Sequence, residues 1–385
     1  MEFTIDRDVF LAGIKKTLGI VDKKATMPIL SNLLLRTAGH EDAGIEIVAT
    51  DLEIGLVAGL EASIIAEGRI TLSALILFEM VRELQGETVH VLSPAAASEA
   101  VLTCNKAVCK LRGIPADDYP DMDDHEDPDL PFFKIKASAL KELIRKVSFA
   151  ISTDETRPAQ NGVFFEKEIP ADTSNVSMMR MVATDGHRLS MARMKMEESD
   201  ISIPGIPRPN SAQGIIIPRK GLSEIRKMIE EEADDILVGS SPGFLVVKNA
   251  HSSLRISLIA GEYPDYRRVI PEEKGEIARI GKDSILHSLR RMKVINAERV
   301  VITIAKGIAT LNSIHPDWGE CKDEIEAAWD GEERTVSFNV KLLMDAIEVI
   351  DEPTIDFEIR EKFGPGVIRG SGNDNYFCLV MPLRN

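Results

Sequence analysis

The 385-residue sequence predicts an α+β protein built from three copies of one unit, each with two helices packed on antiparallel sheets. Two observations support this prediction. The phrase Ala183-Thr184-Asp185 has a second copy far upstream, Ala49-Thr50-Asp51. Around both copies the same elements recur in the same order: a helix and a strand precede the phrase, and a strand and a second helix follow it. A match this short can arise by chance, whereas a repeated order of elements indicates a duplicated unit.

Four helices in the first two copies are predicted by apolar residues spaced i, i+3 or i+4, and i+7, which mark one face of a helix. The apolar runs are Phe10, Ile14, Leu18 and Val21; Leu75, Phe78 and Val81; Leu140, Leu143, Ile144 and Val147; and Leu222, Ile225 and Met228. The third copy lacks the Ala-Thr-Asp phrase but keeps the plan, with helices predicted over 283–293 and 339–350. We therefore expect two helices in each unit.

Short strands are predicted between the helices, where alternating apolar residues are bounded by Gly, Asn and Asp. Examples are 33–35, 163–165, 244–247 and 300–304, and the last strand is expected over 376–381. The sequence shows no regular alternation of strand, helix and strand. Antiparallel sheets are therefore favoured over parallel ones.

The length fits three domains of ordinary size, and we expect them at 1–128, 129–273 and 274–385. The stretch 121–130 is acidic, contains proline and has no periodicity, which is typical of a connector. It lacks the ligand spacing of a calcium-binding loop. Residues 267–276 are expected to form the second connector.

The composition, 44% hydrophobic and 28% charged residues, is that of a soluble globular protein. The N-terminus does not resemble a signal peptide, and no apolar run approaches the roughly 18–20 residues that span a bilayer. We expect a cytoplasmic protein without a metal or cofactor. Its cysteines, Cys104, Cys109, Cys321 and Cys378, form no C-x-x-C pair and are expected to be buried thiols.

Charged residues are unevenly distributed along the chain, whose formal net charge is −16. Acidic residues gather in 117–129, 230–235 and 320–333. Basic residues gather on the predicted helices: Lys15, Lys16, Lys23 and Lys24; Lys141, Arg145 and Lys146; Arg219, Lys220, Arg226 and Lys227; Arg290, Arg291 and Lys293. A net negative charge argues against a nucleic-acid partner, whereas basic helices in all three units favour one. A set of solvated helix faces is the alternative interpretation.

The segment Asp185-Gly186-His187-Arg188 places a carboxylate, an imidazole and a guanidinium together, so a hydrolase that uses His187 is an alternative. However, the sequence contains no G-x-S-x-G or H-E-x-x-H motif. The spacing of a phosphate-binding loop also fails between Gly275 and Gly281. We expect no catalytic site and interpret the segment as a turn in which Gly186 adopts a positive φ.

A series of longer motifs runs through the whole chain in a familiar order. They are Met27-Pro28-Ile29-Leu30-Ser31-Asn32, Ala49-Thr50-Asp51-Leu52-Glu53, Ala183-Thr184-Asp185-Gly186-His187-Arg188-Leu189, Ile217-Pro218-Arg219-Lys220-Gly221, Tyr263-Pro264-Asp265-Tyr266-Arg267-Arg268-Val269-Ile270-Pro271 and Val380-Met381-Pro382-Leu383-Arg384. With these motifs the chain resembles the β subunit of bacterial DNA polymerase III, the sliding-clamp family.

The resemblance implies three domains of the DNA-clamp fold, whose helices line a channel, and a head-to-tail homodimer that closes into a ring. Domain size agrees with a dimer. A domain of about 125 residues has a diameter of roughly 35 Å. Three such spheres in a circle leave a hole of only about 5 Å, whereas six leave about 35 Å. Duplex DNA passes only through the larger hole.

The resemblance also implies the function of a processivity factor that encircles duplex DNA and slides without sequence specificity. Its implied partners are the replicative polymerase, the clamp loader and repair proteins, which bind through short peptide motifs. The DNA contacts carried over are Lys24, Arg82, Arg219 and Lys220. The partner-peptide pocket carried over comprises Arg157, Thr184, Gly186, His187, Arg188, Leu189, Pro264, Arg268, Val269, Phe363, Pro365, Val380, Met381, Pro382, Leu383 and Arg384.

Leu189, Val269, Val380 and Met381 are expected to form the apolar floor of this pocket, with arginines at its rim. The alternative is that Val380 and Met381 form only the buried side of an edge strand. Two places depart from the family pattern. Pro158-Ala159-Gln160 stands where aromatic and aliphatic residues are common, and the chain ends in Asn385. A non-ring acidic scaffold protein is the remaining alternative function.

Overall fold

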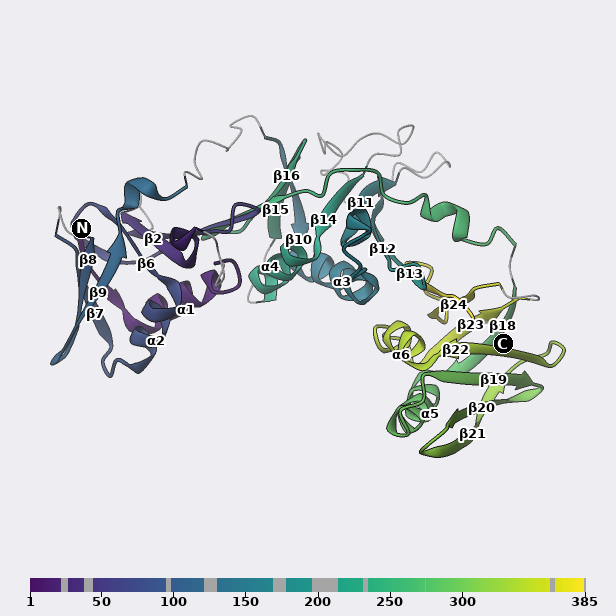
Figure 1. The fold of residues 1–385 in the computed structure, drawn as a ribbon. Coiled ribbons are helices and arrows are strands. Elements are labelled where there is room, and N and C mark those ends of the chain that lie inside the picture. Colours follow the sequence, from purple (N-terminus) through teal and green to yellow (C-terminus); the bar gives the residue numbers. More distant parts are fainter. Residues whose placement is uncertain are drawn as a thin grey trace. The chain divides into compact units, whose positions relative to one another are not determined.

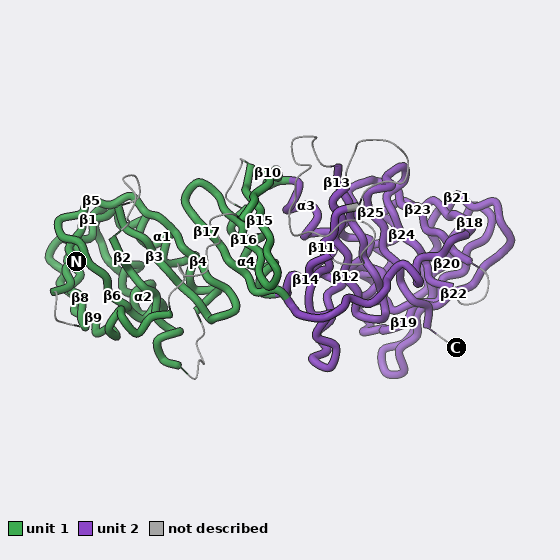
Figure 2. The backbone as a smooth tube through the Cα atoms, turned by 90° about the horizontal axis from the view of Figure 1, so that it is seen from above, with its two compact units in different colours: residues 1–138, 202–205, 220–258 green, residues 139–201, 206–219, 259–385 purple. Residues whose placement is uncertain are grey.

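The computed structural model describes residues 1–21, 27–37, 44–94, 98–120, 130–168, 178–195, 214–230, 235–273, 275–360 and 364–383. They form two compact units, coloured green and purple in Figure 2. The first contains the described residues of 1–138 and 220–258, and the second those of 139–219 and 259–385. The contact-based boundary between the units thus passes through the middle one of the three predicted domains.

The first unit contains a 13-stranded antiparallel sheet in the order β10-β15-β16-β17-β4-β3-β2-β6-β9-β8-β7-β1-β5. The strands are β1 (Glu2–Asp6), β2 (Asn32–Thr37), β3 (Ile45–Thr50), β4 (Ile54–Leu60), β5 (Ser63–Ala66), β6 (Arg69–Ser73), β7 (Thr88–Leu92), β8 (Glu99–Cys104), β9 (Ala107–Ile114), β10 (Phe132–Lys136), β15 (Asp235–Ser241), β16 (Phe244–Lys248) and β17 (Ser252–Ser257). Its helices are α1 (Arg7–Thr17), α2 (Ala74–Glu83) and α4 (Arg219–Glu230). Short 3-10 turns span Pro28–Ser31 and Ala116–Asp118.

The second unit contains a 12-stranded antiparallel sheet in the order β14-β11-β12-β13-β25-β24-β23-β18-β21-β20-β19-β22. The strands are β11 (Gly162–Glu168), β12 (Met178–Thr184), β13 (Arg188–Lys195), β14 (Ile215–Pro218), β18 (Glu276–Gly281), β19 (Arg299–Ala305), β20 (Gly307–His315), β21 (Gly319–Ala328), β22 (Arg334–Asn339), β23 (Thr354–Ile359), β24 (Gly366–Gly370) and β25 (Tyr376–Val380). Its helices are α3 (Ala137–Val147), α5 (Lys282–Val294) and α6 (Val340–Glu348). Short 3-10 turns span Ser148–Ala150, Pro158–Gln160 and Tyr266–Val269.

The predicted fold class, antiparallel sheets with two helices per repeat, is confirmed (Figure 1). Local chemistry explains where the helices begin. The carboxylate of Asp6 accepts the amides of Asp8 and Val9 at 2.9 and 3.0 Å and so caps α1. The side chain of Asn339 caps α6 in the same way, through the amide of Leu342 at 3.1 Å.

The apolar spacing locates the helices but misassigns some of their faces. α1 ends at Thr17, so Leu18 and Val21 lie beyond it. In α2, Leu77 faces the core and Leu75 is exposed. Apolar pairs at helical spacing begin at both residues, so the pattern alone cannot select the buried face.

The element boundaries differ from the predictions by a few residues. The helix predicted over 339–350 spans 340–348, because Asn339 is its cap. The last strand ends at Val380, one residue earlier than predicted. The second predicted connector contains a 3-10 turn at Tyr266–Val269 and meets β18 at Glu276. Most of the first connector, 121–129, lies outside the described residues.

None of the four cysteines, all of which the structure describes, is in a disulfide. Cys104 and Cys378 are buried as predicted, whereas Cys109 and Cys321 are only half-buried. The prediction of buried thiols is therefore wrong for these two. Both lie on the less exposed side of their strands, β9 and β21, and that side is only partly covered at these positions. Within the described part of the chain, no helix is long and apolar enough to cross a membrane.

Each sheet continues from one repeat to the next through one strand pair. We call the pairing of β4 with β17 the first junction, and the pairing of β13 with β25 the second junction. The first joins strands of the first and second repeats, and the second joins strands of the second and third. The predicted site residues lie mainly around the second junction.

Candidate functional site

The turn at Thr184–Arg188 leads into the second junction. Its glycine, Gly186, has φ +87°, a conformation that few other residues adopt without strain. The carboxylate of Asp185 accepts the amides of His187 at 2.9 Å and Arg188 at 3.1 Å, and the hydroxyl of Thr184 donates to the carbonyl of Arg188 at 2.7 Å. The prediction of a turn with a left-handed glycine is confirmed.

The upstream copy makes the same set of bonds before the first junction. The carboxylate of Asp51 accepts the amides of Glu53 at 2.9 Å and Ile54 at 2.6 Å, and the hydroxyl of Thr50 donates to the carbonyl of Ile54 at 2.9 Å. Leu52 takes the place of the glycine, with φ +76°. The repeated phrase therefore encodes a repeated turn.

Arg188 lies inside the second junction. Its side chain forms ion pairs with Asp185 at 3.0 Å and Asp345 at 2.7 Å, and it donates a hydrogen bond to the carbonyl of Phe149. The guanidinium also lies over the ring of Phe149, 5.0 Å from its centroid. With 7% of its surface exposed, Arg188 connects β13 to α6, so in this conformation it is not an exposed rim arginine.

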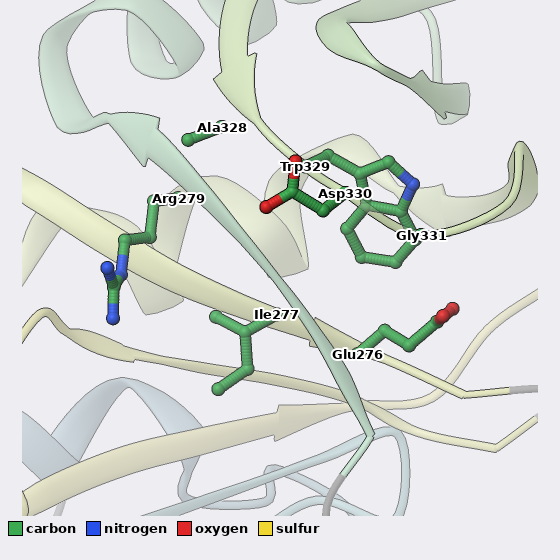
Figure 3. Close-up of a pocket in the computed structure, with 7 residues that line it drawn as sticks. All are labelled: Glu276, Ile277, Arg279, Ala328, Trp329, Asp330 and Gly331. Atoms are coloured by element: carbon green, nitrogen blue, oxygen red, sulfur yellow. The ribbon is translucent and has the colours of Figure 1, made fainter.

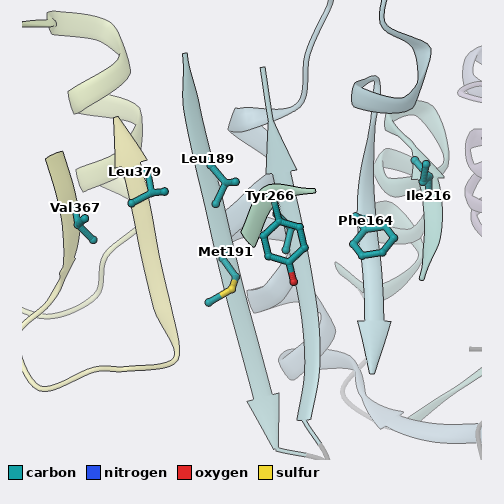
Figure 4. Close-up of a cluster of buried hydrophobic side chains, with 8 residues drawn as sticks. Phe164, Leu189, Met191, Ile216, Tyr266, Val367 and Leu379 are labelled. Carbon is teal, nitrogen blue, oxygen red and sulfur yellow. The ribbon is translucent and has the colours of Figure 1, made fainter. Parts of the chain in front are cut away.

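The apolar residues of the predicted floor divide into two groups. Leu189 is 3% exposed and Val380 is 0% exposed. Leu189 belongs to a buried cluster that also includes Phe164, Val182, Met191, Ile216, Tyr266, Val367 and Leu379 (Figure 4). Val269 and Met381, by contrast, are 50% and 43% exposed. These two side chains present apolar surface, whereas Leu189 belongs to the core.

The remaining predicted pocket residues differ in exposure and in their contacts. The backbone amide of Met381 donates to the carbonyl of His187 at 2.9 Å, which brings the end of the chain to the turn. Arg157 and Arg268 are exposed and form ion pairs with Asp154 at 3.6 Å and Asp265 at 2.9 Å. Pro264 and Leu383 are exposed, and Pro365 and Pro382 are half-buried. Phe363 and Arg384 lie outside the described residues.

A buried polar cluster holds the segment that carries Arg268 and Val269. Glu166 on β11 lies opposite Arg180 on β12, whose guanidinium donates to it at 3.0 Å. The hydroxyl of Tyr266 also donates to Glu166, and it accepts from Arg180 at 2.8 Å. Burial raises the pKa of Tyr266 to about 12. Arg180 acts in the opposite direction, and the neighbouring Glu166 adds to the increase.

The motif Tyr263–Pro271 predicted the segment but not its anchor. Glu166 directly follows the strand predicted over 163–165, and Arg180 lies outside the strands predicted above. The sequence gives no sign that both residues point inward. Only the register of β11 on β12 places them together. Pro158–Gln160, the segment that departs from the family pattern, forms a 3-10 turn. Ala159 packs against the buried cluster of Leu189.

The DNA-contact residues carried over from the family already have partners in the fold. Arg82 pairs with Glu79 and Glu83 on its own helix. Arg219 donates to the carbonyls of Ile151 and Ser152 at 2.6 and 3.1 Å. Lys220 pairs with Asp51 and donates to the carbonyl of Ile20 at 3.1 Å. Lys24 lies outside the described residues.

Other basic residues of the helices fall into two groups, those with an acidic partner and those without one. Arg145 is bound by Glu142 at 2.6 Å and by Asp351 at 2.8 Å, so much of its charge is compensated. Lys15, Lys16, Lys141 and Lys293 are exposed and form no ion pair with any residue the structure describes. The sequence shows which basic residues lie on helices, but it does not show which of them have an acidic neighbour in the fold.

A cavity of about 420 Å³ lies in the third repeat, away from all of these residues. It is lined by Glu276, Ile277, Arg279 and Ala328–Gly331 (Figure 3). Its charged residues are compensated, because Glu276 pairs with Arg334 at 3.2 Å and Arg279 with Asp356 at 3.3 Å. It contains none of the predicted site residues.

The chain matches three family models in order. They describe the N-terminal, central and C-terminal domains of the DNA polymerase III β subunit, over residues 1–123, 134–265 and 267–384. The beta sliding clamp of Caulobacter vibrioides is 30% identical over 388 residues, and that of Pseudomonas aeruginosa is 26% identical, with 100% of both chains covered in each case.

Solved structures show the same relationship. The crystal structure of a DNA polymerase sliding clamp from Caulobacter crescentus has a TM-score of 0.90 at 29% identity, with 100% of both chains covered. A sliding clamp from Bartonella birtlesii bound to griselimycin has a TM-score of 0.90 at 28% identity, again over 100% of both chains. The chain therefore belongs to the DNA polymerase III β subunit family, the β sliding clamps.

Proposed function

We propose that two copies of this sliding clamp close head to tail into a ring around duplex DNA and tether the replicative polymerase to it. The observation that carries the proposal is the match of all three repeats, from residue 1 to residue 384, to the β subunit models. Domain size supports a ring of six domains, since six spheres of roughly 35 Å enclose a hole of similar width.

The proposed organisation has domains at 1–128, 129–273 and 274–385, with helices facing the DNA. Contact with phosphates is sequence-independent and becomes weaker as salt increases. Lys24, Arg82, Arg219 and Lys220 are proposed contacts. We add Lys15, Lys16, Lys141 and Lys293, because these exposed lysines form no ion pair in the described part of the fold.

Charge reversal tests this assignment. Replacing Lys15 and Lys16 together with glutamate should reduce the amount of clamp loaded on primed DNA about tenfold at low salt and flatten its salt dependence. Lys106→Glu and Lys306→Glu together change two exposed lysines outside the helices and serve as the matched control. Equal effects of the two changes would show that net charge matters and that the position on α1 does not.

The proposed partner-peptide site surrounds Val269 and Met381, with Arg157, His187 and Arg268 at its exposed edge. Apolar side chains in the centre of an interface contribute most of the binding energy. Met381→Ala should weaken binding of a polymerase-derived peptide by about 1–3 kcal/mol, measured by calorimetric titration. Ile314→Ala removes another exposed apolar side chain and should leave the affinity unchanged.

We further propose that the protein is a cytoplasmic accessory subunit with no catalytic centre and no cofactor of its own. The polar groups of Thr184 and Asp185 are used in turn hydrogen bonds. His187 makes no side-chain hydrogen bond to any residue the structure describes. His187→Ala would abolish turnover in a hydrolase, whereas here it should affect only partner binding.

Primer extension tests the proposed function. The assay contains the protein with its own replicative polymerase and clamp loader. The DNA product made in one polymerase binding event should become longer by a factor on the order of 10²–10⁴, the increase in avidity that tethering can give. Product lengths that do not change when the protein is added would contradict the proposal. An acidic scaffold protein would give that result.

A further inference from the structure

The two junctions are equivalent by register. Asp51 and Asp185, in the two repeated turns, precede the corresponding strand residues Ala58 and Ala192 by the same number of positions. Ala58 on β4 pairs with Ser252 on β17, and Ala192, at the corresponding place on β13, pairs with Tyr376 on β25. Ser252 therefore occupies in the first junction the position that Tyr376 occupies in the second.

The second junction is filled by this tyrosine. Tyr376 is buried, and its hydroxyl donates to the carbonyl of Ala346 on α6 at 3.1 Å. The ammonium of Lys146 on α3 lies 5.5 Å from the centre of the ring. Lys146 also pairs with Glu142 at 2.8 Å and with Asp351 at 3.4 Å. Ring and ion pairs together occupy the space between α3, α6 and the sheet.

The first junction is hollow at the same place. A cavity of about 240 Å³ lies between α1, α4 and the strands β4 and β17. Its apolar wall comprises Ala12, Ile20, Leu56, Met228 and Leu254, and its polar lining comprises Lys15, Lys16, Glu224, Lys227, Glu230 and Ser252. Ser252 is 7% exposed, and its hydroxyl makes no hydrogen bond to any described residue.

Substitutions between the repeats account for the cavity. α1 and α3 are equal in length and each follows the first strand of its repeat directly. Lys16 thus corresponds to Lys146, and Ala12 corresponds to Glu142. The first junction keeps the lysine but lacks both the tyrosine ring and the glutamate side chain. What remains is the cavity, with Lys16 and the hydroxyl of Ser252 in its lining.

The lining indicates what the cavity would bind. A dry apolar cavity of about 150 Å³ is large enough for benzene, so this one accepts a single aromatic ring with a small substituent. The buried hydroxyl of Ser252 needs a hydrogen-bond partner, because an unsatisfied polar group is costly. Lys15 and Lys16 form no ion pair in the described residues. The two carboxylates of the lining are compensated, Glu224 by Lys227 at 2.7 Å and Glu230 by Arg226 at 3.3 Å. An anionic group would therefore be favoured at the mouth.

We propose that the first junction is a binding site for a small aromatic acid, whose ring replaces the missing tyrosine, whose polar substituent reaches Ser252 and whose carboxylate lies beside Lys15 and Lys16. This site is separate from the proposed partner-peptide site. It shares Lys15 and Lys16 with the proposed DNA contacts, so the binding test is made without DNA. For a ligand of this size we expect a Kd on the order of 1 mM.

The probe is 4-hydroxyphenylacetate, a tyrosine side chain that carries a carboxylate, and binding to the full-length chain is measured by saturation-transfer NMR. Wild type should show saturable binding, and the uncharged amide of the probe should bind several-fold more weakly. Ser252→Tyr supplies the ring from the chain itself and should reduce binding at least tenfold. Ser253→Tyr is the matched control, because residue 253 faces the opposite side of β17 and the cavity stays open.

Ala12→Phe fills the cavity from α1 and provides a second blocking variant if Ser252→Tyr does not fold. Circular dichroism establishes the fold of each variant. Loss of binding in a folded blocking variant, with binding retained in Ser253→Tyr, supports the site. Absence of saturable binding to wild type overturns the proposal, and so does unchanged binding in both folded blocking variants.

Discussion

At the second junction a buried tyrosine and a set of ion pairs fill the space between two helices and the sheet, whereas at the first junction the same space is a cavity. Both junctions follow the same turn, and both continue a sheet through one antiparallel strand pair. The backbone plan is therefore set by turn and register. The side chains between the helices differ, and we expect them to determine how much each junction contributes to the free energy of unfolding.

The largest difference is expected from removal of the ring. Tyr376→Ala should lower the free energy of unfolding by about 3–5 kcal/mol, because it leaves a large cavity and loses the hydrogen bond to Ala346. Ser252→Ala at the equivalent position should cost less than about 1 kcal/mol, since the serine hydroxyl makes no hydrogen bond there. Urea unfolding curves measure both. Similar losses in the two variants would contradict the difference between the junctions.

Removal of Arg188 should have the next largest effect. Arg188→Ala leaves Asp185 and Asp345 without their buried partner, which costs about 3 kcal/mol. Arg268→Ala removes an arginine whose ion pair is exposed and should change stability by less than about 0.5 kcal/mol. The same unfolding measurement compares them. A small effect of Arg188→Ala would mean that the ion pairs do not hold β13 to α6.

The ion pairs of the second junction also predict a dependence on pH. Burial alone would raise the pKa of Glu142, but hydrogen bonds from Arg145 and Lys146 outweigh it and lower the pKa to about 2 from an ordinary 4.5. Because the folded-state value is the lower one, the stabilisation is present above about pH 4.5 and is lost as the pH falls towards 2.

The variant Glu142→Gln isolates this contribution. Its unfolding midpoint should fall below that of wild type at pH 6, and the difference should shrink as the pH decreases to about 3. Ala12, the counterpart of Glu142 at the first junction, carries no charge, and Ala12→Gln should show a difference that does not vary with pH. A constant difference for Glu142→Gln would contradict the assigned role.

The smallest effect is expected from filling the hollow junction. Ser252→Tyr should raise the free energy of unfolding by about 0.5–2 kcal/mol, as cavity-filling changes commonly do. Ser253→Tyr adds the same ring on the other face of β17 and should bring no such gain. A strong destabilisation by Ser252→Tyr would show that the two junctions differ in backbone as well as in side chains.

The sequence predicted those features that depend on neighbouring residues. Helix α5 and the turn at Asp185 could be identified because their signals, apolar spacing and an Asx turn, lie within a few positions. The features that were missed depend on partners far along the chain. Arg145 meets Asp351 and Lys220 meets Asp51 across 206 and 169 residues, and only the folded chain reveals these pairs.

The candidate site shows the same limit. The motifs placed Leu189, Val269, Val380 and Met381 in one region, and the structure brings the segments that carry them together. The pairing of β13 with β25 buries Leu189 and Val380. Residues beyond the end of a strand, such as Met381, remain exposed. Strand register could not be read from motifs separated by almost 200 positions.

The measurement that tests the central claim most directly is retention of the protein on nicked circular DNA after ATP-dependent loading, before and after one cut makes the circle linear. A closed ring should stay bound to the circle at high salt and be released by the cut, because linear ends let it slide off. Equal retention on circular and linear DNA would show ordinary binding and would contradict encirclement.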